Sequence, residues 1–264
     1  MIKAAACAML ILLPASAFAE DRDYCPTRPG LGTTPCTISP GHVSVETALV
    51  DWTLQQNSAQ RTDTVLIGDA FVRIGLFDAI EAQFGWTPYG RVRTRDTVAG
   101  TIDRGSGVGD VTLGLKANLS HPDGSGFSAA VQPFVTVPVS SSAIGAGDWS
   151  AGIVIPVTYD LSEKVNLATT TEFDAAVDQD RHGRHFAASE TIGLGVKLTG
   201  KLTATVEGQA ARDEDPAGKT TQYLASVSLA WLENKNLQFD MGCVAGLNHD
   251  APDVELYAGI SRRF

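Results

Sequence analysis

Apolar and polar residues alternate along the last eleven residues of the chain. One side of this segment carries Val254, Leu256, Ala258, Ile260 and Phe264, and the other carries Glu255, Tyr257, Gly259, Ser261 and Arg263. A period of two predicts a β-strand, and a tilted strand of this length can cross a bilayer. Arg262 falls on the apolar side, where its long stem can reach lipid headgroups. An edge strand of a soluble sandwich would alternate in the same way, so the choice between a membrane-spanning strand and a soluble one depends on the rest of the chain.

Alternating segments of this kind recur along the chain between short polar turns. We predict twelve strands, at residues 42–54, 64–77, 79–89, 109–119, 127–139, 149–159, 165–177, 185–198, 202–212, 221–231, 237–248 and 254–264. One position does not fit the pattern, because Glu190 would face lipid beside Ile192 at a cost of about 2 kcal/mol or more. We therefore expect that Glu190 lies near the membrane edge or that a bulge shifts the register before Ile192.

The connections between these segments alternate in length. Tight turns are predicted at 77–79, 162–164, 199–201 and 233–235, and longer links at 90–107, 140–147, 178–184 and 213–219. Outer-membrane barrels have an even number of strands, with short periplasmic turns and longer external loops. We therefore predict an all-β fold over residues 42–264, a transmembrane antiparallel up-and-down β-barrel of 12 strands, with both termini on the periplasmic side.

The start of the chain predicts export. Lys3 precedes an apolar run, and an Ala-x-Ala site ends at Ala19, so residues 1–19 are expected to be a signal peptide. Residues 20–41 are then predicted to be a periplasmic N-terminal segment. It contains Cys25 and Cys36, which we expect to form a disulfide in an oxidising compartment. The sequence leaves open whether this loop stays in the periplasm or enters the barrel.

Composition and charge narrow the function classes. The mean hydropathy is +0.01, which fits a barrel that averages lipid-facing and lumen-facing residues. The net charge of −10 argues against nucleic acid as a partner. A zinc site formed by Cys25, Cys36 and His42 would lack a fourth ligand. Cys243 has the parity of lipid-facing residues and is expected to be an inert apolar side chain. No metal or cofactor is predicted.

Charged residues on the inward side of the predicted strands are the candidate functional positions. They are Asp69, Arg73, Glu81, Lys116, Glu172, Asp174, Lys197, Glu207, Asp240, Glu255 and Arg263. Buried charges must be paired or hydrated, so these residues either line an aqueous passage or form salt bridges across a closed lumen. In a predicted external loop, Arg91, Arg93 and Arg95 could bind lipopolysaccharide phosphates, attract anions to the mouth, or form an ordinary exposed surface.

One cluster suggests catalysis. His182 and His185 lie in a predicted external loop, with Ser189 nearby, and outer-membrane acyl hydrolases use serine and histidine near the rim. No nucleophile motif accompanies them, and histidines at a loop tip are usually a solvated surface. We therefore predict that the protein is not an enzyme.

Two motifs carry a family resemblance. Residues 74–81 follow the pattern x-G-L-x-D-x-x-E, and residues 107–116 follow G-x-G-D-x-x-x-G-x-K. The chain thereby resembles outer-membrane transporters of the phenol-degradation meta-pathway type. Its terminal Phe264 is similar to the last residue of Gram-negative outer-membrane barrels, which implies recognition by the barrel-assembly machinery.

The resemblance implies a location in the cell outer membrane, in contact with its lipid and lipopolysaccharide, and a role in the uptake of small solutes. It carries over no catalytic residues. Our first hypothesis is a passive channel for small molecules, with aromatic or hydrophobic compounds as the candidate solutes. The alternatives are a barrel enzyme acting on lipids and a closed structural or adhesion barrel.

Overall fold

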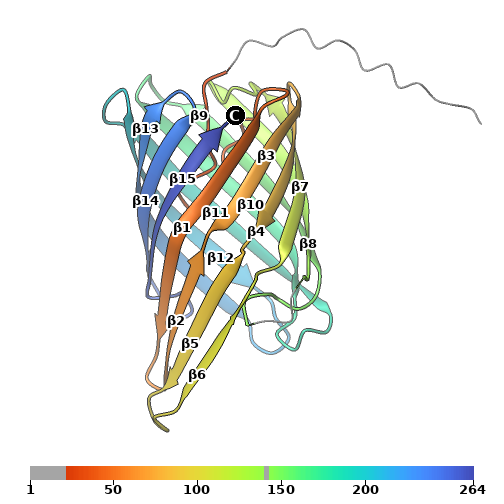
Figure 1. The fold of residues 1–264 in the computed structure, drawn as a ribbon, viewed down its shortest axis with the longest axis vertical. Helices are drawn as coiled ribbons and strands as arrows, with labels where there is room; N and C mark the ends of the chain where they lie inside the picture. The colour runs from red at the N-terminus through yellow and green to blue at the C-terminus, as the bar shows by residue number, and fades with distance from the viewer. Residues whose placement is uncertain (1–21, 140–142) are drawn as a thin grey trace, which may run out of the picture.

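The chain forms one closed antiparallel β-sheet (Figure 1). The computed structural model describes residues 22–139 and 143–264, so the predicted signal peptide lies outside the described residues. The strands are β1 (Val43–Gln56), β2 (Gln60–Ile67), β3 (Asp69–Phe77), β4 (Ile80–Trp86), β5 (Tyr89–Asp96), β6 (Ile102–Gly107), β7 (Val111–Ser120), β8 (Phe127–Val137), β9 (Ser150–Asp160), β10 (Val165–Val177), β11 (Arg184–Lys197), β12 (Leu202–Asp213), β13 (Thr220–Asn234), β14 (Leu237–Gly246) and β15 (Val254–Arg263). Among these residues, no helix is long and apolar enough to span a membrane.

Three pairs of these strands are successive halves of one longer strand. Gly68, with a φ of +72°, separates β2 from β3, and Pro88, which lacks a ladder donor, lies between β4 and β5. Residues 108–110 separate β6 from β7. Pairing of β15 with β1, from Ser44 opposite Arg263 to Leu54 opposite Val254, closes the ring. The barrel therefore has 12 strands, which confirms the prediction.

Burial is the reverse of that in a soluble protein. Leu113 and Leu115 of β7 are 45% and 51% exposed on the outer face, whereas Lys116, at an inward position of the same strand, is 0% exposed. Leu194, Leu229, Met241 and Leu256 are likewise exposed on the outside. Hydrocarbon rather than water surrounds this face, so the apolar side chains remain on the outside and the charged ones lie in the lumen.

The two ends of the barrel differ. The described chain begins at Arg22 and ends at Phe264 at the end with tight turns, such as residues 78–79 and 235–236, which we call the periplasmic end (Figure 1). The external end has longer loops, such as 178–183 and 247–253. One predicted external loop, 90–107, is instead mostly β-structure, because β5 and β6 pair with each other and β5 pairs with β2. We call these three strands the β2–β5–β6 extension, which projects beyond the barrel wall (Figure 1).

Glu190 occupies the outward position that its parity predicted. The pairing of β11 with β12 runs without a shift from Ala187 to Lys197, so the alternative of a bulge before Ile192 is wrong. The hydroxyl of Thr171, also on the outer face, donates a hydrogen bond to Glu190 at 2.5 Å. This partner lowers the cost of placing a carboxyl group on the outer surface.

Candidate functional site: the lumen and its N-terminal plug

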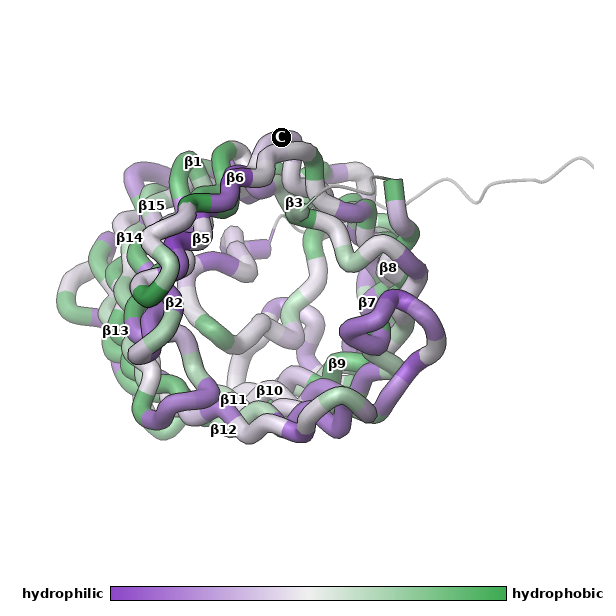
Figure 2. The backbone as a smooth tube through the Cα atoms, turned by 90° about the horizontal axis from the view of Figure 1, so that it is seen from below, coloured by the Kyte–Doolittle hydropathy of each residue, from purple (hydrophilic) through white to green (hydrophobic). Residues whose placement is uncertain are grey.

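Residues 22–41 lie inside the barrel, and we call them the plug (Figures 1 and 2). The sequence assigned residues 20–41 to the periplasm and left open whether the Cys25–Cys36 loop enters the barrel. Contacts with inward side chains of the barrel strands correct the assignment for residues 22–41 and place the loop in the lumen. The physical reason is hydrogen bonding. The plug has no strand partner of its own, so its backbone groups pair with carboxylates, hydroxyls and cations of the lumen.

A disulfide between Cys25 and Cys36 closes the central part of the plug into a loop, as predicted. On one side of the lumen, the amides of Thr27 and Arg28 donate to Glu46 of β1 at 2.8 and 3.0 Å. On the other side, two consecutive amides donate to Glu207 of β12: Leu31 at 2.8 Å and Gly32 at 3.0 Å. The amide of Thr33 donates to Thr170 of β10 at 3.0 Å.

Cations hold the carbonyl groups of the same loop. Lys116 of β7 donates to the carbonyl oxygen of Thr34 at 2.8 Å. Arg73 of β3 donates to the carbonyl oxygens of Cys25 and Cys36 at 2.8 and 2.9 Å. The loop therefore contacts β1, β3, β7, β10 and β12, and it crosses the interior of the barrel rather than lining one wall.

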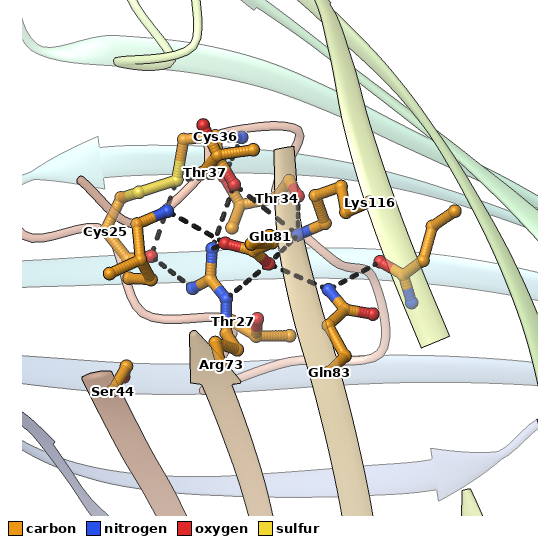
Figure 3. Close-up of polar contacts among 12 residues, drawn as sticks. Cys25, Thr27, Thr34, Cys36, Thr37, Ser44, Arg73, Glu81, Gln83 and Lys116 are labelled. Carbon is orange, nitrogen blue, oxygen red and sulfur yellow. Dashed lines mark hydrogen bonds and ion pairs between the residues drawn. A yellow bond between two sulfur atoms is a disulfide. The ribbon is translucent and has the colours of Figure 1, made fainter. Parts of the chain in front are cut away.

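A fully buried ion network lies beneath this loop (Figure 3). Arg73 pairs with Glu46 at 3.2 Å and with Glu81 at 2.8 Å, and Lys116 pairs with Glu81 at 3.4 Å. All four side chains are 0% exposed, and their formal charges sum to zero. Such burial is tolerated because every charge has an opposite partner and further hydrogen bonds.

Other predicted lumen residues also bind the plug or its flanks. Asp240 accepts a hydrogen bond from Arg28 of the plug at 2.9 Å. Arg263 donates to the carbonyl oxygen of Arg22 at 2.5 Å and to Asn236. These contacts join the plug to β14 and β15, and Glu46 joins it to β1, so the plug is attached to both sides of the β15–β1 seam that closes the barrel.

The remaining predicted lumen residues lie apart from this network. Asp69 accepts from Thr87 at 2.6 Å, and Lys197 is exposed beside the hollow at the periplasmic end. Glu172 and Asp174 share a face of β10 towards the external end. Glu255 lies beside Asp51.

Three charged residues of this site were not predicted from the sequence: Arg28, Glu46 and Asp51. A bulge between Ala48 and Val50 shifts the alternation along β1, so that both acids point inward although they are five residues apart. The signal that could have found Glu46 is its position as a single acid within an apolar stretch. Arg28 belongs to the plug, where no periodicity indicates direction.

Two hollows lie on either side of the plug loop. The external hollow, of about 430 Å³, is lined by residues that include Asp69, Phe71, Phe134 and Glu172. The periplasmic hollow, of about 340 Å³, is lined by residues that include Asp160, Lys164, Asn166 and Lys197. Both are lined by Thr27, Arg28, Gly32 and Thr33. The plug loop is thus the shared wall between them.

His185, from the predicted histidine cluster, contacts carboxylates at the ends of two external loops, 178–183 and 214–219. Nδ1 of His185 lies 2.9 Å from Asp178, and Nε2 lies 3.0 Å from Asp213. Ligand atoms of Asp178, His185 and Asp215 lie within 4.8 Å of one another, a spacing that a metal ion could also bridge. The amide of Ala217 donates to Asp215 and lowers the pKa of its carboxyl group. Among the described residues, no hydrogen bond joins Ser189 to His182 or His185, so a catalytic pair is not assembled there.

The three arginines predicted in a loop lie in β5. Arg91, Arg93 and Arg95 alternate with Val92 and Thr94, and all three share one face of the β2–β5–β6 extension. The stretch looked like a loop because neither face of it is apolar, which is expected of a strand that extends beyond the membrane.

Comparisons with known proteins agree with this architecture. The model of the family described as "Putative MetA-pathway of phenol degradation" matches residues 27–264. The β domain of the Bordetella autotransporter BrkA aligns with a TM-score of 0.51 at 12% identity, over 86% of this chain and 100% of that one. The transport unit of the Escherichia coli autotransporter AIDA-I aligns with a TM-score of 0.51 at 6% identity, over 83% and 88%.

A third structure, the CymD monoaromatic hydrocarbon channel, aligns with a TM-score of 0.45 at 8% identity, over 86% of this chain and 88% of that one. No curated protein sequence matches the chain significantly. At these identities the structural alignments concern the fold alone. A 12-stranded barrel with an apolar outer face is an outer-membrane protein.

Proposed function

We propose that this chain, which belongs to the family described as "Putative MetA-pathway of phenol degradation", is an outer-membrane channel for small solutes. In the closed state the plug blocks the passage, and movement of the plug loop admits the solute. Passage in this proposal is passive, down the concentration gradient of the solute.

The observation that carries the proposal is the shared wall between the two hollows. The external and periplasmic hollows are separated by residues 27–33, and that segment is held at its far side by Glu207 and Thr170. A barrel with a purely structural role would not need hollows on both sides of a short segment. A displacement of a few ångströms at this loop would join the hollows into one passage.

The lining of the external hollow favours aromatic solutes. Phe71 of β3 and Phe134 of β8 face this hollow amid Gln83, Gln132 and Glu172. The two rings offer an aromatic surface for a solute ring, and the amides and carboxylate offer partners for its polar groups.

Replacing both rings, Phe71→Ala with Phe134→Ala, is expected to reduce discrimination in favour of aromatic solutes. Uptake of benzyltrimethylammonium and of its cyclohexylmethyl analogue into proteoliposomes would be compared. Aromatic contacts contribute about 0.5–1.5 kcal/mol, so the ratio of the two rates should fall by roughly threefold. The control, Phe173→Ala with Phe239→Ala, removes two rings from the outer face and should leave the ratio unchanged. An unchanged ratio in the lumen variant would contradict the aromatic preference.

The external half of the lumen is acidic, which predicts cation selectivity. Asp69, Glu172 and Asp174 face it, and Arg28 is the one cation lining the external hollow. Charge reversal by Glu172→Lys with Asp174→Lys should shift the reversal potential in a KCl gradient towards anion selectivity. The same reversals at Asp180 and Asp250, in exposed external loops, are the control and should have little effect. If both variants behave alike, the selectivity does not arise at β10.

The two alternative functions give different results in the same proteoliposomes. A lipid-acting enzyme would release fatty acid from phospholipid and lose that activity with His185→Ala. A structural barrel would pass no solute, even after the contacts of the plug loop had been removed. Solute flux without lipid hydrolysis is the result expected here.

A further inference from the structure

The β2–β5–β6 extension carries five arginines on one face. In the pairing of β2 with β5, Arg61 lies opposite Arg95, and Asp63 lies opposite Arg93. Directly opposite residues project from the same face of a sheet, and so do residues two apart along one strand. In the pairing of β5 with β6, Arg93 lies opposite Arg104. The face therefore carries Arg61, Arg91, Arg93, Arg95 and Arg104.

This arginine face is the outer one. Trp52 of β1 lies opposite Val65 of β2 and opposite Leu256 of β15, which is 45% exposed on the outside of the barrel. The indole N–H of Trp52 donates to Asp63 at 3.3 Å, so Asp63 lies on that side as well. The arginines therefore point away from the lumen.

The opposite, inner face of the extension is covered by the loop between β8 and β9. A side chain at Gly90 would meet Ile144, and one at Gly105 would meet Ala143. Asp110, at the base of the extension, accepts a hydrogen bond from the amide of Ala146 at 2.7 Å. The inner face is thus packed against protein, while Arg91, Arg95 and Arg104 on the outer face are exposed.

The positive charge on the outer face is not neutralised within the protein. Asp63 is the one acid on this face of the three strands, and Arg61 binds it with two hydrogen bonds, at 2.9 and 3.0 Å. Within the described part of the chain, no carboxylate forms an ion pair with the other four arginines. Arg93 lies directly opposite Arg104, an arrangement of like charges that is destabilising without an anion between them.

An apolar band lies beside the arginines on the same face. Ile67 is 47% exposed and Tyr89, directly opposite it, is 43% exposed, both where the extension joins the barrel. Arg91 and Arg93 follow Tyr89 at steps of two residues, each about 7 Å farther from the barrel. A ligand that fits this face therefore has apolar chains at the level of Tyr89 and anionic groups at the level of the arginines.

We propose that the outer face of the extension binds the phosphate groups of lipopolysaccharide, with its acyl chains against the apolar band. Guanidinium groups bind phosphate oxygens in a bidentate manner, and neighbouring arginines can share one phosphate. A soluble acidic protein would match the charge but not the adjacent membrane-level band. The proposal does not depend on transport, since the arginines face away from the lumen.

The test uses the full mature chain in detergent and bisphosphorylated lipid A as the probe, with binding followed by thermophoresis. Each arginine near an anionic membrane surface contributes about 1 kcal/mol, so Arg93→Gln with Arg104→Gln should weaken binding by roughly tenfold or more. The control, Arg181→Gln with Arg212→Gln, removes one arginine from a loop and one from the end of β12 at the same end of the barrel, and this variant should bind as the wild type does. Heat-modifiable migration in gels checks that each variant is folded.

Two further measurements on the wild type separate the possible anions, and they do not depend on a variant folding. Lipid A stripped of phosphate should bind roughly tenfold or more weakly. Inorganic phosphate alone should not bind with comparable affinity. The proposal is overturned if the double variant binds lipid A like the wild type, if dephosphorylated lipid A binds equally well, or if inorganic phosphate binds as tightly as lipid A does.

Discussion

Removing the anchors at the far side of the plug loop, by Glu207→Ala with Thr170→Val, is expected to raise conductance in planar bilayers by roughly two orders of magnitude. The carboxylate of Glu207 accepts the amides of Leu31 and Gly32, and the hydroxyl of Thr170 accepts the amide of Thr33. Hydrogen bonds to charged groups contribute about 1.5–3 kcal/mol each. Losing about 3 kcal/mol changes the ratio of open to closed barrels roughly hundredfold.

The matched control for this experiment is Glu172→Ala. Glu172 is another lumen carboxylate, placed in the external hollow, but among the described contacts none joins it to the plug. Its removal should change selectivity while leaving the frequency of opening near that of the wild type. If the double variant stays as silent as the wild type while folding normally, the plug loop is not the barrier, and a structural barrel becomes the better explanation.

The strand pattern was predictable from sequence because each strand has one face towards lipid and the other towards the lumen. Alternation in residues 109–119 assigned Leu113 and Leu115 to lipid and Lys116 to the lumen, and their exposures of 45%, 51% and 0% agree. Parity is a local property, so it survives wherever the strand is regular. It failed at β1, where the bulge after Ala48 turned Glu46 and Asp51 to the same side.

The position of the plug was not predictable in this way. Its hydrogen bonds join residues far apart in sequence, such as Leu31 and Glu207, and no periodic pattern connects them. One local sign was present in the motif around Gly75. A side chain at that inward position would collide with the backbone carbonyl of Ser39, so the glycine is required for the plug to pass close to β3. From the sequence alone, a glycine in a strand does not indicate which segment packs against it.

The buried network predicts the largest loss of stability. Arg73→Met would leave Glu46 and Glu81 facing each other in a site that is 0% exposed, and the carbonyl groups of Cys25 and Cys36 would lose their donor. Removing one partner of a buried ion pair costs about 3–5 kcal/mol. Urea unfolding in lipid vesicles, followed by gel migration, should show a loss of this size. At Arg61, 42% exposed and paired with Asp63 on the extension, the same change should cost less than about 1 kcal/mol.

A compensating variant separates charge from packing at Arg73. If the loss arises from an uncompensated carboxylate, adding Glu46→Gln to Arg73→Met should recover much of the stability, because Glu81 keeps Lys116 as its partner and a neutral amide is cheaper to bury than a carboxylate. The Arg73→Met change also removes the donor to the plug carbonyl groups, so it is expected to raise the conductance, and the added substitution should not return the conductance to the wild-type level. Recovery of both would mean that the contacts of the plug with strands other than β3 are enough to hold it in place. Recovery of neither would mean that the shape of the guanidinium, rather than its charge, keeps the lumen and the plug together.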